Sequence, residues 1–396
     1  MNTKSAHVRV CVTLLTFAFT TFVAYSTRSD DSRPKDAPAG VQPPFRVAPG
    51  LFDANDLKTL GLRTVNGTHS LLYQASDDDY KFCHHPNLVV FKNQLYCMWS
   101  NGLVHEDAPG QRILYSRSGD GVTWTKPELL TDDRQGKGIC VAAGFHVIPN
   151  KLVAYYTATG GENFHPDTAL MARTSLDGKK WSQPLRVTSG FFIEGPQRLA
   201  GGRLLFAGEY VGDSRATMRM RFLFTNDRGG ISQLQNVTVN PPELKVYGYT
   251  EPSFYLRPDG SVVATLRNYS GFLHTSASTD NGETWSPVTQ TNLPDSTART
   301  SAGNLPDGTA YIINNSMPKQ FDRSLLTIAL SRDGKTFDRA WIVRGEPTKM
   351  RYEGRSKLDG WQYPHAVVWK DTLYVAYSIN KEDVALTRIT LKDLAR

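Results

Sequence analysis

Short apolar runs alternate with turn residues from residue 82 to the end of the chain. Leu88–Phe91 and Gln94–Trp99 flank Lys92 and Asn93, a pattern that predicts a β-hairpin. A third apolar run, Arg112–Ser116, follows a Pro-Gly break. Five further pairs of apolar runs around Gly, Asn or Asp turns follow in order: AGFHVIPNKLVAYYT, GPQRLAGGRLLFAGE, PSFYLRPDGSVVATLRN, AGNLPDGTAYIINN and PHAVVWKDTLYVAYS. We therefore expect an all-β chain built from six similar units.

One turn motif marks most of these units. It consists of Ser or Thr, one residue, Asp, and then Gly at once or one residue later, at Ser118/Asp120, Ser175/Asp177, Thr225/Asp227, Ser278/Asp280 and Ser331/Asp333. An Asp side chain can close such a turn on its own backbone, and an aromatic ring follows four of the five motifs. A period of about 50 residues with four strands per unit is typical of a β-propeller. We predict a single propeller with six blades, seven being compatible, in which Ser70–Gln74 completes the last blade.

The N-terminal region predicts secretion. A positively charged start precedes the uncharged run Val10–Thr27, and small residues near Ser26 suit cleavage, so residues 1–26 are interpreted as a signal peptide. An uncleaved single membrane anchor is the alternative. We interpret 27–64 as a linker and N-terminal extension and 65–396 as the catalytic propeller. The expected product is a secreted or periplasmic monomer without stable membrane insertion.

Charge and cysteine content narrow the function classes. The net charge of +7 is modest for 396 residues and no basic cluster stands out, so we expect no nucleic-acid partner. Cys83, Cys97 and Cys140 form no CxxC pattern and are expected to be buried thiols. There is no HExxH motif and no closely spaced His/Asp ligand set, so no metal or cofactor is expected in the chemistry. A structural cation such as calcium in the central channel remains compatible with the pattern.

The expected functional face is the one opposite the turn motifs, where first strands begin and second strands end. Loops that converge on one side of a rigid scaffold commonly carry function. The candidate residues there are His84, His85, Asn101, His105, Arg198, Tyr210, Tyr249, Arg267, Arg299, Tyr363 and His365. A structural role is the alternative for each, because polar side chains also satisfy strand ends.

Individual candidates differ in the role expected of them. Only one of His84 and His85 is expected to point inward, because adjacent strand residues face opposite sides. His146 is expected in the core, and Glu194 and Glu251 could line a central water channel.

The candidate set suits proton transfer beside a carboxylate. Imidazoles with a pKa near 6.5 act as base or acid near neutrality, and His85 and His105 bracket one hairpin. An Arg such as Arg267 or Arg198 can pair with a uronate carboxylate and acidify the neighbouring C–H. We therefore predict β-elimination at a uronic acid. One histidine removes the proton, and the other histidine, or a Tyr such as Tyr249 or Tyr210, protonates the departing oxygen.

Several segments resemble a known group of enzymes. HHPNLVVFKNQLYCMWSNG and HEDAPGQR, with EGPQRL, EPSFYLRPDGS, SAGNLPDGTAYI, YPHAVV and NKEDV, are similar to secreted propeller enzymes that act at L-rhamnose-α-1,4-D-glucuronate linkages. That group includes rhamnose–glucuronate lyases, ulvan lyases and related rhamnosidases. The resemblance implies a polysaccharide lyase acting on an acidic oligo- or polysaccharide. It also implies two site histidines about 20 residues apart, which His85 and His105 match. The rhamnosidases use a histidine of the same segment on a different face, so the motif does not separate the two reactions.

The turn motifs also resemble the Asp-boxes of sialidases, which gives the competing prediction. Sialidases bind the sialate carboxylate through three arginines and use a Tyr nucleophile with a Glu partner and an Asp acid. Arg267, Arg299 and Tyr363 could fill three of these places. However, the F-R-x-P strand that normally supplies the first arginine is not matched, and His85 stands at that position. A glycan-binding propeller without catalysis is the third alternative.

Overall fold

The computed structural model describes residues 42–131, 137–160, 166–211, 219–237, 239 and 249–395. The predicted signal peptide lies outside these residues. All described residues belong to one compact unit, Gly40–Arg396.

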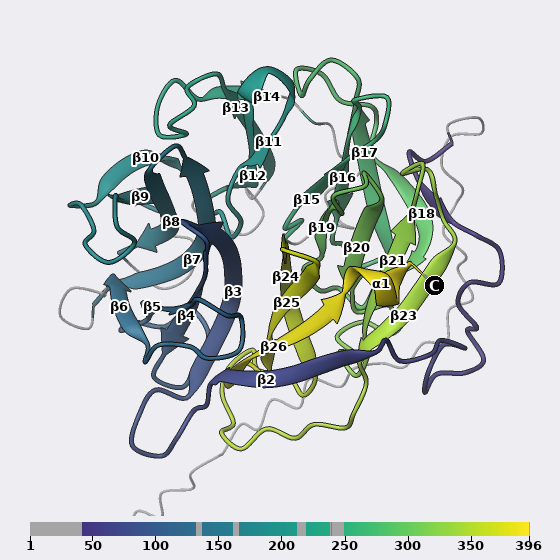
Figure 1. Ribbon diagram of the computed structural model, residues 1–396, viewed down its shortest axis with the longest axis horizontal. Helices are drawn as coiled ribbons and strands as arrows, with labels where there is room; N and C mark the ends of the chain where they lie inside the picture. The colour runs from purple at the N-terminus through teal and green to yellow at the C-terminus, as the bar shows by residue number, and fades with distance from the viewer. Residues whose placement is uncertain are drawn as a thin grey trace, which may run out of the picture. The chain divides into compact units, whose positions relative to one another are not determined.

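Six four-stranded antiparallel sheets form the blades (Figure 1). The first three blades are β3 (Phe82–Phe91), β4 (Gln94–Gly102), β5 (Arg112–Ser118) and β6 (Glu128–Thr131); β7 (Ile139–Ile148), β8 (Lys151–Thr159), β9 (Ala169–Ser175) and β10 (Leu185–Ser189); and β11 (Gln197–Arg198), β12 (Leu204–Tyr210), β13 (Arg219–Thr225) and β14 (Gln235–Val237). A short 3-10 turn, Ala200–Gly202, joins β11 to β12.

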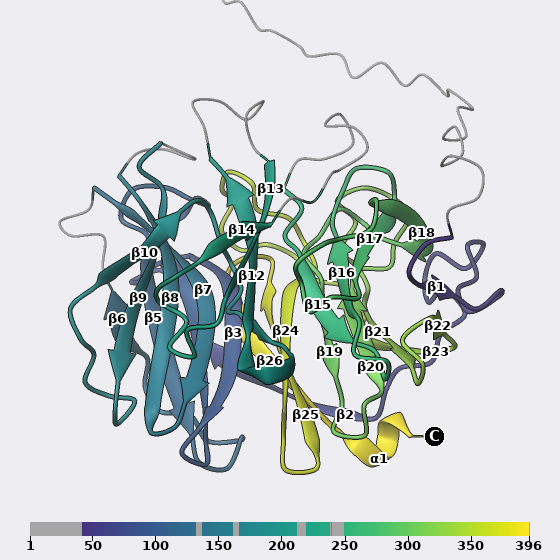
Figure 2. The same cartoon turned by 90° about the horizontal axis from the view of Figure 1, so that it is seen from above.

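The second half of the unit repeats this order. The remaining blades are β15 (Ser253–Leu256), β16 (Val262–Leu266), β17 (Phe272–Ser278) and β18 (Thr289–Pro294); β19 (Ser301–Asn304), β20 (Ala310–Asn314), β21 (Leu326–Ser331) and β23 (Arg339–Arg344); and β24 (Trp361–Trp369), β25 (Thr372–Ile379), β26 (Asp383–Thr390) and β2 (Gly67–Tyr73). The chain ends in the short helix α1 (Leu391–Leu394). In each blade the first strand lies toward the centre and the fourth toward the edge (Figure 1). Figure 2 shows the blades from the side, with β6 and β10 at one edge and β18 and β23 at the other.

The predicted six-bladed propeller is confirmed, including its closure. Strand β2 pairs with β26 from Gly67↔Ile389 to Tyr73↔Val384, so the N-terminal part of the chain supplies the last strand of the final blade. This pairing joins the two ends of the repeat array.

The Asp-boxes lie where the sequence placed them, between the third and fourth strands. In the first box Asp120 Oδ1 accepts hydrogen bonds from the Ser118 hydroxyl at 2.9 Å and the Thr123 amide at 2.7 Å. The box aromatic ring packs between neighbouring blades: Trp285 lies 4.7 Å from Phe222, centroid to centroid. Burying rings of this size stabilises the fold by about 1.5–3 kcal/mol each. The boxes are therefore structural devices.

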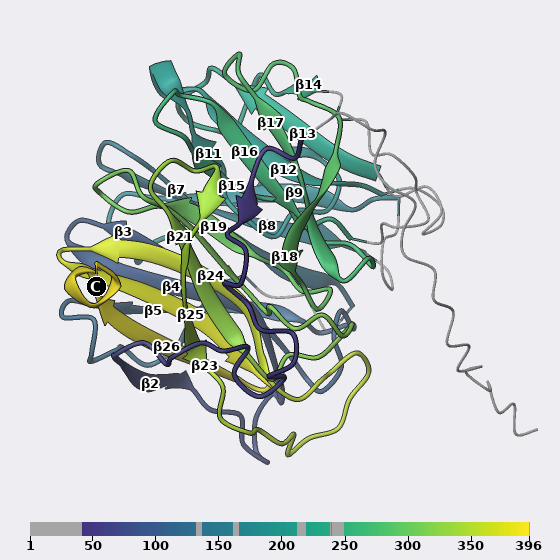
Figure 3. The same cartoon turned by 90° about the vertical axis from the view of Figure 1, so that its right-hand side faces the viewer.

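A second N-terminal segment braces the outside of the blades. Strand β1 (Arg46–Val47) pairs in parallel with the short strand β22 (Thr336–Phe337). The amide of Val47 also donates to Asn292 Oδ1 in β18 at 2.8 Å. Figure 3 shows β1 beside the fourth and fifth blades. The segment therefore ties two adjacent sheets together.

The expected buried thiols are confirmed, since Cys83, Cys97 and Cys140 are buried and none of the three forms a disulfide. No helix in the described part of the chain has the length and apolar character needed to cross a membrane.

Candidate active site

A pocket of about 400 Å³ opens at the centre of the face opposite the Asp-boxes. Its walls come from the starts of first strands, the ends of second strands and the loops between them. The lining residues are His85, Glu106, Asp107, Phe191, Tyr249, Glu251, Arg267, Tyr269, Phe321, Arg323, Ser356, Leu358, Tyr363 and Lys381.

The backbone holds many of these side chains in an uncommon conformation. Seven of the fourteen have positive φ angles, namely His85, Asp107, Glu251, Phe321, Ser356, Tyr363 and Lys381. Positive φ is costly for residues other than glycine, and such residues concentrate at functional sites. The pocket is therefore a place where the fold holds side chains against local backbone preference.

Proline marks three of these positions. His85, Glu251 and Tyr363 each precede a proline at the start of an inner strand. In β3 and β24 the strand register shifts at this point, between His84 and Asn87 and between Gln362 and His365. Proline lacks an N–H for the strand ladder, and a bulge re-aims the neighbouring side chain. This local device turns His85 and Tyr363 into the pocket.

A hydrogen-bonded triangle of Tyr363, Glu251 and Arg267 forms one wall of the pocket. The Tyr363 hydroxyl donates to Glu251 Oε1 at 2.8 Å. Arg267 Nη1 donates to Glu251 Oε2 at 2.5 Å and to the Tyr363 oxygen at 2.6 Å. Burial raises the pKa of Tyr363, so the phenol keeps its proton near neutral pH. Glu251 is the group placed to accept that proton if the oxygen attacks a substrate.

Two more cations lie against the ring of Tyr363. The guanidinium carbon of Arg323 is 5.3 Å from the ring centroid, and Lys381 Nζ is 5.6 Å from it. Arg323 is held by a hydrogen bond to Gln362 Oε1. Three cationic side chains, those of Arg267, Arg323 and Lys381, therefore line one pocket. Such a set favours a ligand that carries a carboxylate.

The loop after β4 brings two carboxyl groups to the same pocket. Burial, and then the charge of Glu106, raise the pKa of Asp107 to about 7. Asp107 is therefore partly protonated at neutral pH, which suits a general acid. Glu106 instead accepts a bond from Lys381 Nζ at 2.5 Å and remains paired.

The two adjacent histidines correct one expectation. His84 and His85 are both buried, and their ring centroids lie 3.8 and 5.1 Å from that of Tyr363. They do not point to opposite sides, because the bulge and the positive φ of His85 break strand alternation here. Burial and the nearby Lys381 and Arg299 charges lower the pKa of both far below its usual range, so both are neutral.

The folded chain also brings together a set of metal-ligating groups. Ligand atoms of His84, His85 and Glu106 lie within 4.8 Å of one another. Sequence spacing did not indicate this set, because Glu106 comes from another strand end. Lys381 occupies one Glu106 oxygen, and its charge opposes a cation at the same place. The groups are therefore better suited to holding Tyr363 than to binding a divalent ion.

Comparison with known proteins fits this architecture. Residues 93–375 match the family described as BNR repeat-like domain. The chain belongs to this BNR repeat-like family. A sialidase of Bacteroides fragilis (strain YCH46) is 23% identical over 294 residues, which is 68% of this chain and 50% of the relative. The chain thus spans about half the length of that curated relative.

Solved structures share the fold. A Trypanosoma rangeli sialidase in complex with sialic acid superposes with a TM-score of 0.63 and 13% identity over 84% of this chain and 60% of that one. An intramolecular trans-sialidase from Ruminococcus gnavus gives a TM-score of 0.64 and 14% identity over 85% of this chain and 99% of that one. The Asp-box, sialidase-like part of the expected resemblance is thereby confirmed. Specificity for rhamnose–glucuronate linkages stays a prediction.

The BNR protein brings four of the predicted site residues into the pocket lining: His85, Tyr249, Arg267 and Tyr363. His84 lies directly behind them. His105 is exposed on the rim, where its Nδ1 accepts the amide hydrogen of Arg355 at 3.0 Å. His105 therefore contacts a loop and does not face the pocket interior.

The other predicted residues lie elsewhere. Arg299 is fully buried beneath the pocket and pairs with Glu194 at 3.3 Å. His365 lines a second pocket of about 350 Å³ and accepts the Leu88 amide at 3.1 Å. The remaining three make local contacts: Asn101 to the Phe82 carbonyl, Arg198 to the Val147 carbonyl and Tyr210 to Asn236.

Asp107 and Arg323 were not among the residues expected at the site. Lys381 was expected at a strand end of this face but was not selected as a site residue, and Glu251 was expected to be able to line a water channel. A usable signal was present, because His85, Glu251 and Tyr363 all precede proline at a predicted strand start. No comparable pattern marks Arg323. It reaches the pocket from a loop between β20 and β21, and only the fold places it there.

Proposed function

We propose that this BNR protein is a retaining glycoside hydrolase of the sialidase type. Tyr363 is the nucleophile, Glu251 its base, and Asp107 the acid that protonates the leaving group. The observation that carries the proposal is the 2.8 Å hydrogen bond from the Tyr363 hydroxyl to Glu251 Oε1 inside a pocket lined by cations. A Tyr nucleophile is the recognised exception among glycosidases that otherwise use two carboxylates.

The first half-reaction balances with these residues. The Tyr363 oxygen bonds to the anomeric carbon while its proton passes to Glu251. The bond from the anomeric carbon to the leaving-group oxygen breaks, and that oxygen takes the proton of Asp107. In the second half, water attacks the anomeric carbon and gives a proton to Asp107. The Tyr363 oxygen leaves and recovers its proton from Glu251.

The charges of the pocket support a carboxylate-bearing sugar as the substrate. Arg267, Arg323 and Lys381 supply three positive charges against the carboxylates of Glu106 and Glu251, and Asp107 is mostly neutral below about pH 7. The balance is one positive charge, which matches one substrate carboxylate. A neutral phenol is also repelled less by a carboxylate beside the anomeric carbon than an anionic nucleophile is.

The test is digestion of sialyl-lactose, followed by NMR of the released sugar. The proposal expects free sialic acid whose first-formed anomer has the configuration of the substrate. Inversion at the anomeric carbon would contradict a covalent tyrosine intermediate. Absence of release, with turnover of another acidic glycan, would contradict the substrate assignment.

Elimination at a rhamnosyl-glucuronate linkage is the second candidate. It is favoured by one observation, namely that His85, Tyr249 and Arg267 line the same pocket. The neutral imidazole of His85 could accept a proton from the uronate carbon. Digestion of rhamnosyl-glucuronate oligosaccharides distinguishes the two reactions, because elimination creates an unsaturated uronate with strong ultraviolet absorbance and hydrolysis does not.

A further inference from the structure

A fifteen-residue segment between β23 and β24, residues 346–360, crosses the rim of the pocket. We call it the strap. Two of its residues, Ser356 and Leu358, line the pocket, and Ser356 has a φ of 61°. The segment has no regular helix or strand, so its position depends on side-chain anchors.

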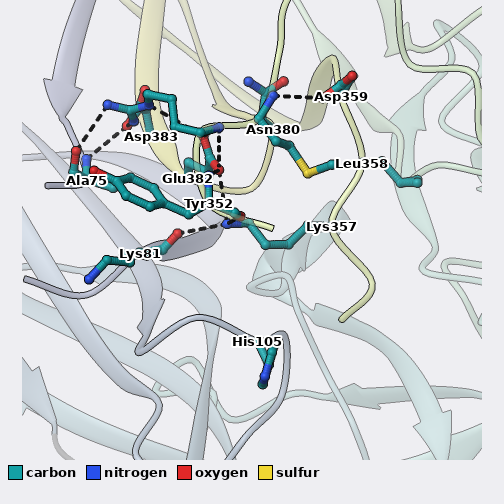
Figure 4. Close-up of polar contacts among 12 residues, drawn as sticks. Ala75, Lys81, His105, Tyr352, Lys357, Leu358, Asp359, Asn380, Glu382 and Asp383 are labelled. Carbon is teal, nitrogen blue, oxygen red and sulfur yellow. Dashed lines mark hydrogen bonds and ion pairs between the residues drawn. The ribbon is translucent and has the colours of Figure 1, made fainter. Parts of the chain in front are cut away.

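A buried ion pair anchors the strap to the last blade. Lys357 Nζ lies 3.2 Å from Glu382 Oε1, and both side chains are completely buried. The same ammonium donates to the carbonyl oxygen of Lys81 at 3.1 Å (Figure 4). Arg351 adds a bond to Asp383. A buried pair of this kind is costly to break, because the remaining charge is left without a partner.

The strap also binds the loop that carries the proposed acid. Arg355 is the contact: its amide donates to His105 Nδ1 at 3.0 Å, and its carbonyl accepts the Glu106 amide at 3.3 Å. Its guanidinium donates to the carbonyl oxygens of Glu106 and Asp107 at 3.3 and 3.4 Å. Four hydrogen bonds from one residue therefore fix the strap against the backbone of the acid.

The two segments are too close for a larger residue at Gly354. A Cβ there would lie 2.7 Å from the Val104 carbonyl oxygen and 2.8 Å from Cδ of Lys357. Real Cβ atoms do not approach backbone oxygen so closely. The strap and the acid loop are thus packed as one unit.

We infer that the strap is the subsite for the leaving group, and that His105, Arg355 and Lys357 are positioning residues for it. The inference rests on the proposed function, in which Asp107 gives its proton to the leaving-group oxygen. The strap is hydrogen-bonded to the backbone of that acid, and its residues Ser356 and Leu358 line the same pocket as Asp107, so the strap borders the place where the leaving group departs. The hydroxyl of Ser356 and the side chain of Leu358 suit a second sugar, which offers both hydroxyl groups and an apolar C–H face.

The experiment compares two substrates that share the sialic acid and differ in the leaving group. Sialyl-lactose has a poor leaving group that needs both the acid and the subsite. In an aryl sialoside the leaving group is an acidic phenol, which departs without much help from the acid or the subsite. For His105→Ala and Arg355→Ala we expect kcat/KM on sialyl-lactose to fall by about 10–100-fold, as small misplacements of catalytic groups do. On the aryl sialoside kcat/KM should fall by a much smaller factor.

Controls separate positioning from folding. His105→Asn offers an amide oxygen near the place of Nδ1 and should restore most of the loss on sialyl-lactose. Arg186→Ala, at an exposed position on the edge strand β10, should leave kcat/KM on both substrates unchanged. Ser356→Ala and Leu358→Ala should raise KM for sialyl-lactose more than they lower kcat.

Each remaining outcome contradicts the inference. Equal losses on both substrates would mean that the strap only supports the fold, and unchanged kinetics would mean that it does not border the leaving group. Both results require an active wild-type enzyme. A wild-type protein that hydrolyses neither sialoside would instead overturn the proposed function, and the inference with it.

Discussion

The hydroxyl group of Tyr363 donates to Glu251 at 2.8 Å although 112 residues separate them in the chain. Tyr363 lies near the start of β24 in the last blade, and Glu251 directly precedes the fourth blade, so only closure of the propeller brings them together. Arg267 bonds to both partners and holds the pair in a fixed orientation.

Removing the Tyr363 hydroxyl should abolish turnover without unfolding the protein. Tyr363→Phe deletes the proposed nucleophile, and we expect kcat to fall by at least about 10³-fold, as losses of catalytic nucleophiles do. The variant also loses hydrogen bonds to buried charged groups, which should lower the free energy of unfolding by about 1–3 kcal/mol. Steady-state kinetics and thermal unfolding measure the two effects.

The matched control for this substitution is Tyr73→Phe, which removes a hydroxyl from the outer strand β2. It should leave kcat unchanged. A fluorinated sialoside slows breakdown of the covalent intermediate. Its sugar should therefore remain attached to Tyr363 and raise the mass of the peptide that contains this residue. Label on another residue would contradict the assignment of the nucleophile.

The basic limb of the pH profile should report Asp107. Burial and the Glu106 charge raise the pKa of Asp107 to about 7, and the acid must be protonated to act. We therefore expect kcat/KM on sialyl-lactose to fall as pH rises through about 7. Asp107→Asn should lower it by about 10²–10⁴-fold and remove this limb. If the basic limb persists in the variant, it reports another group.

The same shift has a consequence for stability. The folded-state pKa of Asp107 lies above its ordinary value of 3.8, so between these pH values the folded protein binds more protons than the unfolded chain. Its contribution to stability is largest below pH 3.8 and is lost as pH rises toward 7. Asp107→Asn should therefore make the free energy of unfolding less dependent on pH across this window. Denaturant unfolding at several pH values measures it.

The fold was predictable because its signals are local and repeated. Each Asp-box closes its own turn, as Asp120 does with Ser118 and Thr123, so spacing alone gave the blades and the face of the pocket. The bulge at His85 was not predictable from alternation, since it depends on Pro86 and on pairing with β4.

The site was only partly predictable because its chemistry depends on contacts between distant residues. Tyr363 and Arg267 were candidates by position, yet their partner Glu251 was not recognised. The pKa of Asp107 is raised to about 7 only because folding buries its carboxyl group, so the proposed acid could not be recognised from the sequence. His105 was assigned to proton transfer from its spacing, whereas its folded neighbour is Arg355.

Glu209 should matter through Glu251. Its Oε1 accepts hydrogen bonds from the amide and hydroxyl of Thr250 and, at 3.3 Å, from the amide of Glu251, whose φ is 39°. Glu209→Ala removes the acceptor that holds this strained backbone, and we expect kcat to fall by about 10–100-fold. Glu209→Gln keeps an oxygen acceptor and should retain most of the activity. Equal losses in both variants would show that the charge matters and not the position.

The Asp-box of the fourth blade should affect stability and leave the active site intact. Asp280 Oδ1 accepts hydrogen bonds from the Ser278 hydroxyl at 2.8 Å and the amides of Glu283 and Thr284 at 3.1 and 2.8 Å. Asp280→Ala deletes a side-chain acceptor that caps a turn, a loss of about 1 kcal/mol and about 2 °C in Tm. The kinetics should not change, because the box lies on the face opposite the pocket.

The contribution of Asp280 to stability depends on pH. Burial opposes ionisation of Asp280, but hydrogen bonds from Thr284 and Ser278 prevail and lower its pKa to about 2. The carboxylate therefore stabilises the fold fully above its ordinary pKa of 3.8, and the contribution is lost as pH falls toward 2. The difference in stability between wild type and Asp280→Ala should shrink over that range, whereas exposed Asp371→Ala should show little difference at any pH. Unchanged Tm with lost turnover in Asp280→Ala would mean that the box serves the site directly.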